Sequence, residues 1–275
     1  MEATPTLSDA QDFRRRYGPR ALILGGSEGI GASFAERLAA MGFDLTLAAR
    51  RKAVLEETAA ALRARHAVDV ATEVIDLTAP DVAARAGEII AAGDFGLVVY
   101  NAGATHGAGL FLDRPLEAAL DLVALNCAGP VAFAHHALRP MRERGRGGLI
   151  LLSSMSAMAG SGYVATYAAS KSFEMILAEG LHWEMARAGV DVLCAVASLT
   201  DTPAMVRSGL RLDADPDYVA MDPAAVADGA LAHLGRQAVW FAAGEEAERA
   251  LRAAPRLALS DQMSRASARL YGIPV

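Results

Sequence analysis

The chain has 275 residues, of which 53% are hydrophobic and 21% charged, and its formal net charge is −6. This length allows one large buried core, so we expect a single domain over residues 1–275. The basic residues are scattered rather than gathered into a positive stripe, which excludes nucleic acid as the expected partner and favours a small molecule.

The amino-terminal residues 1–20 are predicted to form a polar extension. Its arginine cluster at residues 14–16 is followed by no apolar stretch of the kind found in signal peptides, and we expect a solvated first helix. Nothing later reaches the roughly 18 uninterrupted apolar residues of a membrane span. Cys127 and Cys194 fall in apolar surroundings and indicate a reducing compartment, while no Cys, His and carboxylate cluster has metal-ligand spacing. We therefore expect a cytoplasmic protein without a metal.

Apolar runs that resemble strands alternate with longer helical patterns, as is typical of repeated βαβ units. Helices are predicted over 30–41, 52–65, 82–92, 116–141 with a split or kink at Gly129-Pro130, and from about Tyr167 to residue 188. The predicted strands are 21–25, 45–49, 70–75, 95–100, 149–152, 191–197 and 238–242. The fold class is therefore α/β, with one Rossmann-like, doubly wound parallel sheet of about seven strands in the order 3-2-1-4-5-6-7 and helices on both faces.

Two segments follow no strand pattern. Residues 198–222 form the least regular connection, which we interpret as a substrate lid, with a disordered loop as the alternative. Residues 244–275 are rich in alanine and arginine and predict a helical tail that is interrupted at Pro255.

A glycine-rich turn, Gly25-Gly26-Ser27-Glu28-Gly29-Ile30-Gly31, directly follows the first predicted strand and opens a helix. Glycines in this place let the backbone approach a pyrophosphate, whose charge meets the helix amides, so the turn predicts dinucleotide binding; the alternative is a tight structural turn. The second strand ends in Arg50-Arg51. A guanidinium suits the 2′-phosphate of NADP, so NADP(H) is expected, with Arg50 as the main contact and Arg51 as its backup.

Tyr167 and Lys171 lie four residues apart on one predicted helix face. A free phenol has a pKa of about 10, and an ammonium one helical turn away favours the phenolate. Ser154 ends the apolar run 147–154, at the sheet edge where ligands of α/β proteins bind. The three side chains predict a general acid/base site centred on Tyr167. Tyr163 stands two turns from Lys171 and is assigned to the pocket wall or the surface.

In order and spacing, these motifs resemble the short-chain dehydrogenase/reductase family from about residue 17 to residue 243. The resemblance implies an NADP-dependent oxidoreductase with the catalytic residues Asn126, Ser154, Tyr167 and Lys171, in which Asn126 helps to hold a proton-relay water. It also implies a homodimer or homotetramer formed through the helices of Asn126 and Tyr167. The implied cofactor contacts are Gly25, Ser27, Glu28, Gly29, Ile30, Gly31, Arg50, Arg51, Asp76, Leu77, Asn101, Ala102, Gly103, Tyr167, Lys171, Thr200 and Thr202.

The chain departs from the family pattern at two places. Leu24 stands where a threonine is usual, and Ala197-Ser198 replaces a Pro-Gly pair that shapes the nicotinamide pocket. An intact set of four catalytic residues nevertheless favours an enzyme over the alternative, a non-catalytic NADP-binding sensor or interaction protein on the same fold.

The expected substrate is a mainly apolar carbonyl compound or its secondary alcohol. Residues 13–18 are similar to the hydroxysteroid and long-chain 3-ketoacyl reductase branch, which implies a ketone, a hydroxysteroid-like molecule or a 3-ketoacyl chain. The candidate wall residues, for each of which core packing is the alternative, are Thr105, His106, Met155, Met158, Tyr163, Leu199 and Met205.

Overall fold

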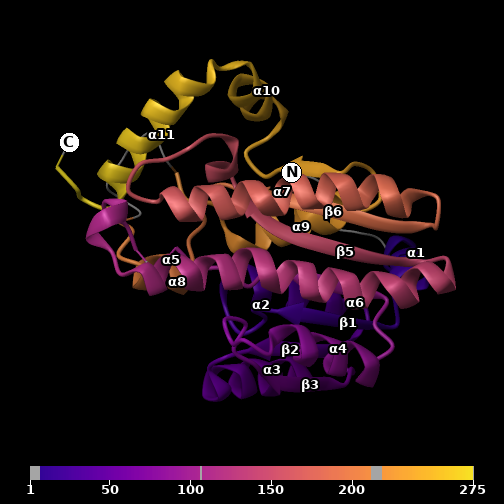
Figure 1. The fold of residues 1–275 in the computed structure, drawn as a ribbon. Helices are drawn as coiled ribbons and strands as arrows, with labels where there is room; N and C mark the ends of the chain where they lie inside the picture. The colour runs from indigo at the N-terminus through magenta and orange to yellow at the C-terminus, as the bar shows by residue number, and fades with distance from the viewer. Residues whose placement is uncertain (1–6, 106, 212–218, 275) are drawn as a thin grey trace.

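The computed structural model describes residues 7–105, 107–211 and 219–274, which form one parallel sheet flanked by helices (Figure 1). The strand order is β3-β2-β1-β4-β5-β6-β7, and every neighbouring pair is parallel, which confirms the predicted fold class. The strands are β1 (Arg20–Leu24), β2 (Asp44–Ala49), β3 (Val70–Val74), β4 (Leu97–Tyr100), β5 (Gly147–Ser154), β6 (Val190–Ala197) and β7 (Val239–Phe241).

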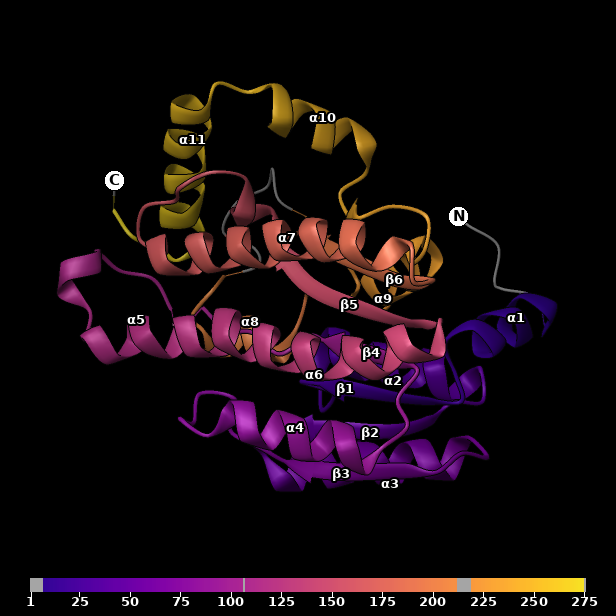
Figure 2. The same cartoon turned by 45° about the vertical axis from the view of Figure 1, so that its right-hand side comes forward.

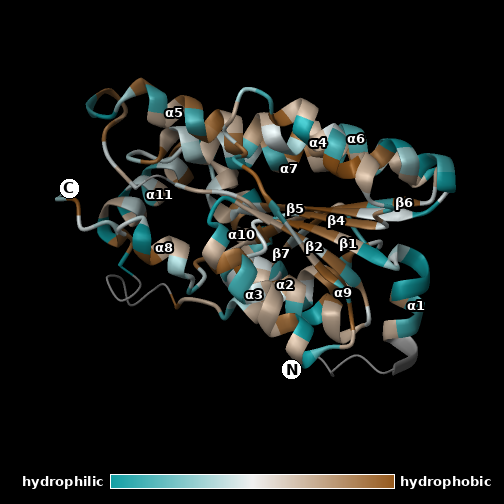
Figure 3. Ribbon diagram, turned by 90° about the horizontal axis from the view of Figure 1, so that it is seen from below, coloured by the Kyte–Doolittle hydropathy of each residue, from teal (hydrophilic) through white to brown (hydrophobic). Residues whose placement is uncertain are grey.

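Helices cover both faces of the sheet. Figure 3 shows α4, α6 and α7 on one face and α2, α3 and α9 on the other. The C-terminal helices α10 and α11 project beyond the sheet on the side of α7 (Figure 2). The helices are α1 (Leu7–Tyr17), α2 (Gly29–Ala40), α3 (Lys52–Arg65), α4 (Val82–Ala92), α5 (Leu116–Val123), α6 (Gly129–Arg144), α7 (Ala165–Ala186), α8 (Pro203–Arg207), α9 (Pro223–His233), α10 (Glu245–Ala253) and α11 (Arg256–Leu270).

The core consists of two apolar layers separated by the sheet. Successive side chains of a strand point to opposite faces, so Leu22 and Leu24 of β1 pack beneath α4, α6 and α7, while Ala21 and Ile23 pack beneath α2, α3 and α9. Strands that are buried on both faces need continuous apolar sequence. This is why the apolar runs located the central strands from sequence.

The predicted split or kink at Gly129-Pro130 coincides with a boundary between two elements, because α6 begins at Gly129. The irregularity is a π-helical turn over Ala124–Ala128, closed by the Gly129 N–H, which donates to the Ala124 carbonyl. This leaves the Leu125 carbonyl without its usual donor, and the buried hydroxyl of Tyr100 donates to it at 2.7 Å. The helical stretch is therefore not interrupted: a more widely wound π-helical turn ends at Ala128, and α6 begins at Gly129.

The continuous helical stretch Leu116–Arg144 is long and apolar enough, by length and composition, to cross a membrane. About two fifths of its most apolar window, 39%, is nevertheless buried inside the structure. Its α6 part packs against α4 and β5, and a helix that belongs to the core of a soluble protein meets the same criteria.

Candidate active site

Two adjoining cavities lie at the carboxyl ends of the central strands. One has a volume of about 550 Å³ and is lined by the glycine-rich turn and the ends of β2 and β4. The other, of about 640 Å³, contains Ser154, Tyr167 and Lys171. Asn101 and Gly103 line both cavities, so the first cavity adjoins the one that contains these three side chains.

The glycine-rich turn is shaped by close backbone contacts. Gly25 has a φ of 79°, which favours glycine, and Asn101 Nδ2 donates to its carbonyl at 3.0 Å. A Cβ on Gly31 would lie 2.0 Å from the Gly25 oxygen. Gly31 and Asn101 therefore fix the path of the turn, and Gly25 and Gly29 expose it to the cavity.

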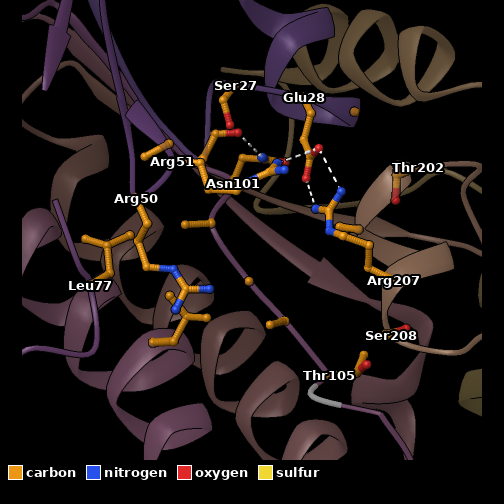
Figure 4. Close-up of a pocket in the computed structure, with 18 of the residues that line it drawn as sticks. Ser27, Glu28, Arg50, Arg51, Leu77, Asn101, Thr105, Thr202, Arg207 and Ser208 are labelled. Atoms are coloured by element: carbon orange, nitrogen blue, oxygen red, sulfur yellow. Dashed lines mark hydrogen bonds and ion pairs between the residues drawn. The ribbon is translucent and has the colours of Figure 1, made fainter. Parts of the chain in front are cut away.

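Arg50 and Arg51 follow β2 at the rim of the first cavity but have different surroundings (Figure 4). Arg51 Nη2 lies 2.6 Å from Glu28 Oε2, whereas the Arg50 guanidinium extends into the cavity. Glu28 also accepts from Arg207 of α8, with Nη1 at 3.0 Å from Oε2. Burial raises the pKa of Glu28, but the hydrogen bonds and charges of the two arginines outweigh burial and hold the pKa low.

Asp76 stands after β3 at the same cavity. Its carboxylate accepts from the Thr78 backbone N–H at 3.0 Å and from the Thr78 hydroxyl at 2.8 Å, and these bonds lower its pKa. The predicted cofactor residues that line this cavity are Gly25, Ser27, Glu28, Gly29, Ile30, Arg50, Arg51, Asp76, Leu77, Asn101, Ala102, Gly103 and Thr202. Thr200 lines the second cavity together with Tyr167 and Lys171.

Ser154, Tyr167 and Lys171 converge in the second cavity. Ser154 is the last residue of β5, and Lys171 Nζ lies 5.9 Å from the centre of the Tyr167 ring. Burial raises the pKa of Tyr167, whereas the Lys171 charge and a hydrogen bond with Ser154 lower it. The lysine acts in the predicted direction, but burial outweighs it, and the pKa of Tyr167 lies above its ordinary value.

Lys171 has a buried partner that was not predicted from the sequence. Its Nζ donates to the Leu152 carbonyl and to Glu174 Oε2, both at 2.8 Å, and the Glu174 side chain is fully buried. A carboxylate three residues after a lysine on the same helix is the sequence signal for this pair.

Asn126 lies behind these groups in the π-helical turn. Its Nδ2 donates to the Ser170 hydroxyl at 2.9 Å, while its buried Oδ1 has no hydrogen-bond partner among the described residues. A Cβ on Gly103 would lie 3.0 Å from Lys171 Nζ and 3.5 Å from Asn126 Oδ1. The structure thus brings Asn126 to the side of Lys171 that Gly103 keeps open.

The candidate wall residues separate into groups. Thr105, Met155, Leu199 and Met205 line the second cavity. Met158 instead packs against the core. The tyrosine at 163, with a φ of 65°, lines a separate cavity of about 50 Å³, and His106 lies outside the described residues.

Helix α11 supplies a wall that was not predicted. Its Leu259, Met263 and Ala266 line the second cavity, and the following Tyr271 places its hydroxyl 3.0 Å from Thr105 Oγ1. These residues recur at helical spacing, so the apolar face of the tail was the available signal.

The segment predicted as a lid lies against the glycine-rich turn. Thr202 caps α8 by accepting from the Met205 N–H at 3.3 Å. A Cβ on Gly29 would lie 2.9 Å from Thr202 Cγ2, so the two segments are in close contact. Residues 212–218 of the segment lie outside the described residues. In the part of the chain that the structure describes, no group of His, Cys, Asp and Glu could hold a metal ion.

Comparison with known proteins connects this geometry to a family. The family model "short chain dehydrogenase" matches residues 19–211. A 7beta-hydroxysteroid dehydrogenase of Clostridium sardiniense is 31% identical over 84% of the chain and 88% of its own length. A very-long-chain 3-oxoacyl-CoA reductase of Laccaria bicolor is 30% identical over 67% of the chain, which spans only 56% of that protein. The structure of a short-chain dehydrogenase from Sphingobium yanoikuyae in complex with NADPH superposes with a TM-score of 0.79 at 30% identity, covering 84% of this chain and 90% of the other.

Proposed function

The chain belongs to the short-chain dehydrogenase family, and on this premise we propose that it transfers a hydride between NADP(H) and the carbonyl or secondary alcohol of a mainly apolar substrate. The observation that carries the proposal is the convergence of Ser154, Tyr167 and Lys171 in a cavity that adjoins the glycine-rich turn. Hydroxysteroid and 3-oxoacyl-CoA enzymes among the relatives support a bulky ketone or a ketoacyl chain as the substrate.

The residues of the first cavity fit an NADP(H) molecule. The turn at Gly25 and Gly29 exposes backbone to the cavity, as a pyrophosphate requires. Arg50 extends into the cavity where a 2′-phosphate would be held, and its guanidinium can fork onto phosphate oxygens. The relative solved with NADPH supports the same cofactor. When bound, the nicotinamide supplies or accepts the hydride.

The side chains of the second cavity handle the proton and the developing charge. Ser154 and Tyr167 donate hydrogen bonds to the carbonyl oxygen, and preorganised donors of this kind stabilise an alkoxide in a water-poor site. Tyr167 gives its proton to that oxygen during reduction and takes it back during oxidation. Lys171 favours the phenolate, since its charge lowers the pKa of Tyr167.

Turnover tests this proposal directly. We expect the purified chain to oxidise NADPH with bulky ketones or 3-ketoacyl thioesters, and Tyr167→Phe to lose about 10²- to 10⁴-fold in kcat/KM while still binding NADPH. If no carbonyl compound is turned over while NADPH still raises the melting temperature, the enzyme assignment fails and a cofactor-binding sensor is the better description.

We also propose that the chain self-associates through α5, α6 and α7. Figure 2 shows these helices along the same side of the molecule, and large apolar side chains are exposed on them. They are Leu116, Leu120, Val123, Val131, Phe173, Ile176 and Trp183. Light scattering tests the proposal: a monomer in wild type contradicts it, and a dimer or tetramer that Ile176→Asp dissociates supports it.

A further inference from the structure

We propose that Glu174 is a positioning residue for the Tyr167–Lys171 pair: its buried carboxylate anchors the Lys171 ammonium and offsets its charge, and so limits how strongly that ammonium favours the Tyr167 phenolate. The inference rests on the proposed function, because it concerns the same proton-transfer site.

The anchoring role follows from the three N–H donors of the ammonium. One N–H donates to Glu174 Oε2 on the same helix, and a second donates to the Leu152 carbonyl of β5, both at 2.8 Å. This leaves one donor for Tyr167 or a ligand on the side of Gly103, where a Cβ would lie 3.0 Å from Nζ. Without the carboxylate, Nζ would have a second unassigned donor and more than one favourable position.

The charge role follows from burial. Glu174 and Lys171 form a nearly solvent-free ion pair, with 0% and 5% exposed side chains. Charges in such a place are poorly screened, so the negative charge acts on Tyr167 as well as on its own partner. It raises the pKa of Tyr167, opposite in sign to the effect of Lys171.

Glu174 carries its charge in the pH range where Tyr167 ionises. Burial raises its pKa to about 7, with Lys171 acting in the opposite direction, and Oε1 has no hydrogen-bond partner among the described residues. The ionisable groups that interact electrostatically with it come from α7, β4, the π-helical turn and β6. They are Lys171, Tyr167, Tyr100, Cys127 and Cys194. Lys171 is the cation among them, which makes it the group through which Glu174 acts.

The test is the titration of Tyr167, followed by NMR in protein with tyrosine labelled at Cζ and assigned with Tyr167→Phe. In Glu174→Gln we expect the midpoint of the Tyr167 titration to fall by about 0.5 pH units or more, because no carboxylate then offsets the positive charge of Lys171. Glu184→Gln is the matched control, since Glu184 is an exposed carboxylate on the same helix, and its midpoint should equal that of wild type. An unchanged or higher midpoint in folded Glu174→Gln overturns the proposal, because a merely structural role would not move it downward.

A second variant tests the anchoring role. In Glu174→Asp the charge remains but the carboxylate is one methylene shorter, so we expect a near-wild-type midpoint and a kcat about tenfold lower, through a displaced Nζ. A wild-type kcat in this variant overturns the anchoring role, including in the case that Glu174→Gln does not fold. The NMR titration needs no substrate, so it decides the charge role even if the chain turns over no carbonyl compound.

Discussion

Arg207 of α8 donates a hydrogen bond to Glu28 of the glycine-rich turn, with Nη1 at 3.0 Å from Oε2. The contact joins the segment predicted as a lid to the turn predicted to hold the cofactor. Arg51, which lies between β2 and α3, pairs with the same carboxylate at 2.6 Å. One acidic side chain therefore connects three elements around the first cavity (Figure 4).

Removing the Arg207 guanidinium should weaken the contact between α8 and the glycine-rich turn. For Arg207→Ala we expect NADPH and NADH to bind about 3- to 10-fold more weakly, because the state with α8 against the turn becomes less populated. The free energy of unfolding should change by less than about 1 kcal/mol, since the Arg207 side chain is half-exposed. Calorimetric titration measures the affinities, with Arg252→Ala, which breaks an exposed pair on α10, as the control. Unchanged affinity for both cofactors would show that α8 does not act as a lid.

The same carboxylate predicts a pH dependence of stability. The pKa of Glu28 is held below its ordinary value in the folded chain, so its ionised form stabilises the fold above the unfolded pKa of about 4.3. This stabilisation is lost as the pH falls through the lower folded value. Wild type should therefore lose its advantage in unfolding free energy over Glu28→Gln as the pH falls from about 5 to about 3. Urea titrations at each pH measure this difference. A difference that grows over this range would contradict the assignment.

Arg50 and Arg51 should differ in their effect on cofactor preference. Arg50→Ala should weaken NADPH about tenfold or more and leave NADH nearly unchanged, because hydrogen bonds between charged groups contribute about 1.5–3 kcal/mol. Arg51→Ala should have the smaller effect, since Arg51 already pairs with Glu28. Equal losses for the two cofactors in Arg50→Ala would refute the assignment of the 2′-phosphate.

The parts of this architecture that could be predicted are those that give a recognisable pattern in a short stretch of sequence. The strand at 149–152 is an unbroken apolar run because both its faces are buried, and the turn at 25–31 shows its glycines because the backbone has no room for side chains. Long-range contacts carry no such local pattern. Arg207 meets Glu28 across 179 residues of sequence, and Tyr271 meets Thr105 across 166.

The burial of Glu174 and the π-helical turn are two other features that could not be predicted from the sequence. Glu174 was within reach of local reasoning, three residues from Lys171, but its burial depends on how α7 packs on β5 and β6. The missing N–H of Pro130 predicted an irregularity beside Gly129, but not that it would be a π-helical turn. The turn at Ala124–Ala128 instead exploits the hydroxyl of Tyr100 on another element, which satisfies the carbonyl that the turn releases.

The wall formed by α11 predicts a change in substrate size. Met263→Trp should fill part of the second cavity and raise KM for a bulky ketone about tenfold, while a small ketone and NADPH are affected little. Leu257→Trp is the matched control, because Leu257 is on the same helix with 87% of its surface exposed. Steady-state kinetics with both ketones measures the effect. Equal changes for the bulky and the small ketone would exclude α11 from the substrate site.

The end of α1 predicts a stability effect far from the site. Tyr17 is buried, and its hydroxyl donates to Asp191 Oδ2 at 2.6 Å, beside Arg16 Nε at 2.7 Å from the same oxygen. Tyr17→Phe should lower the free energy of unfolding by about 1.5–3 kcal/mol, because a buried hydrogen bond to a charged group is lost. Arg16→Ala, which removes the more exposed partner, should lower it by less than about 1 kcal/mol.

The Tyr17 contribution should also depend on pH. Burial is the largest cause that raises the pKa of Tyr17 above its ordinary value, and the hydrogen bond and charge of Asp191 add to it. The folded chain therefore keeps a phenol proton that the unfolded chain releases at a pH of about 10. Stability then falls as the pH rises above that value, and the advantage of wild type over Tyr17→Phe should shrink there. Urea unfolding at pH of about 8 and about 10.5 checks this. An advantage that is constant or larger at the higher pH would mean that the pKa of Tyr17 is not raised in the folded chain.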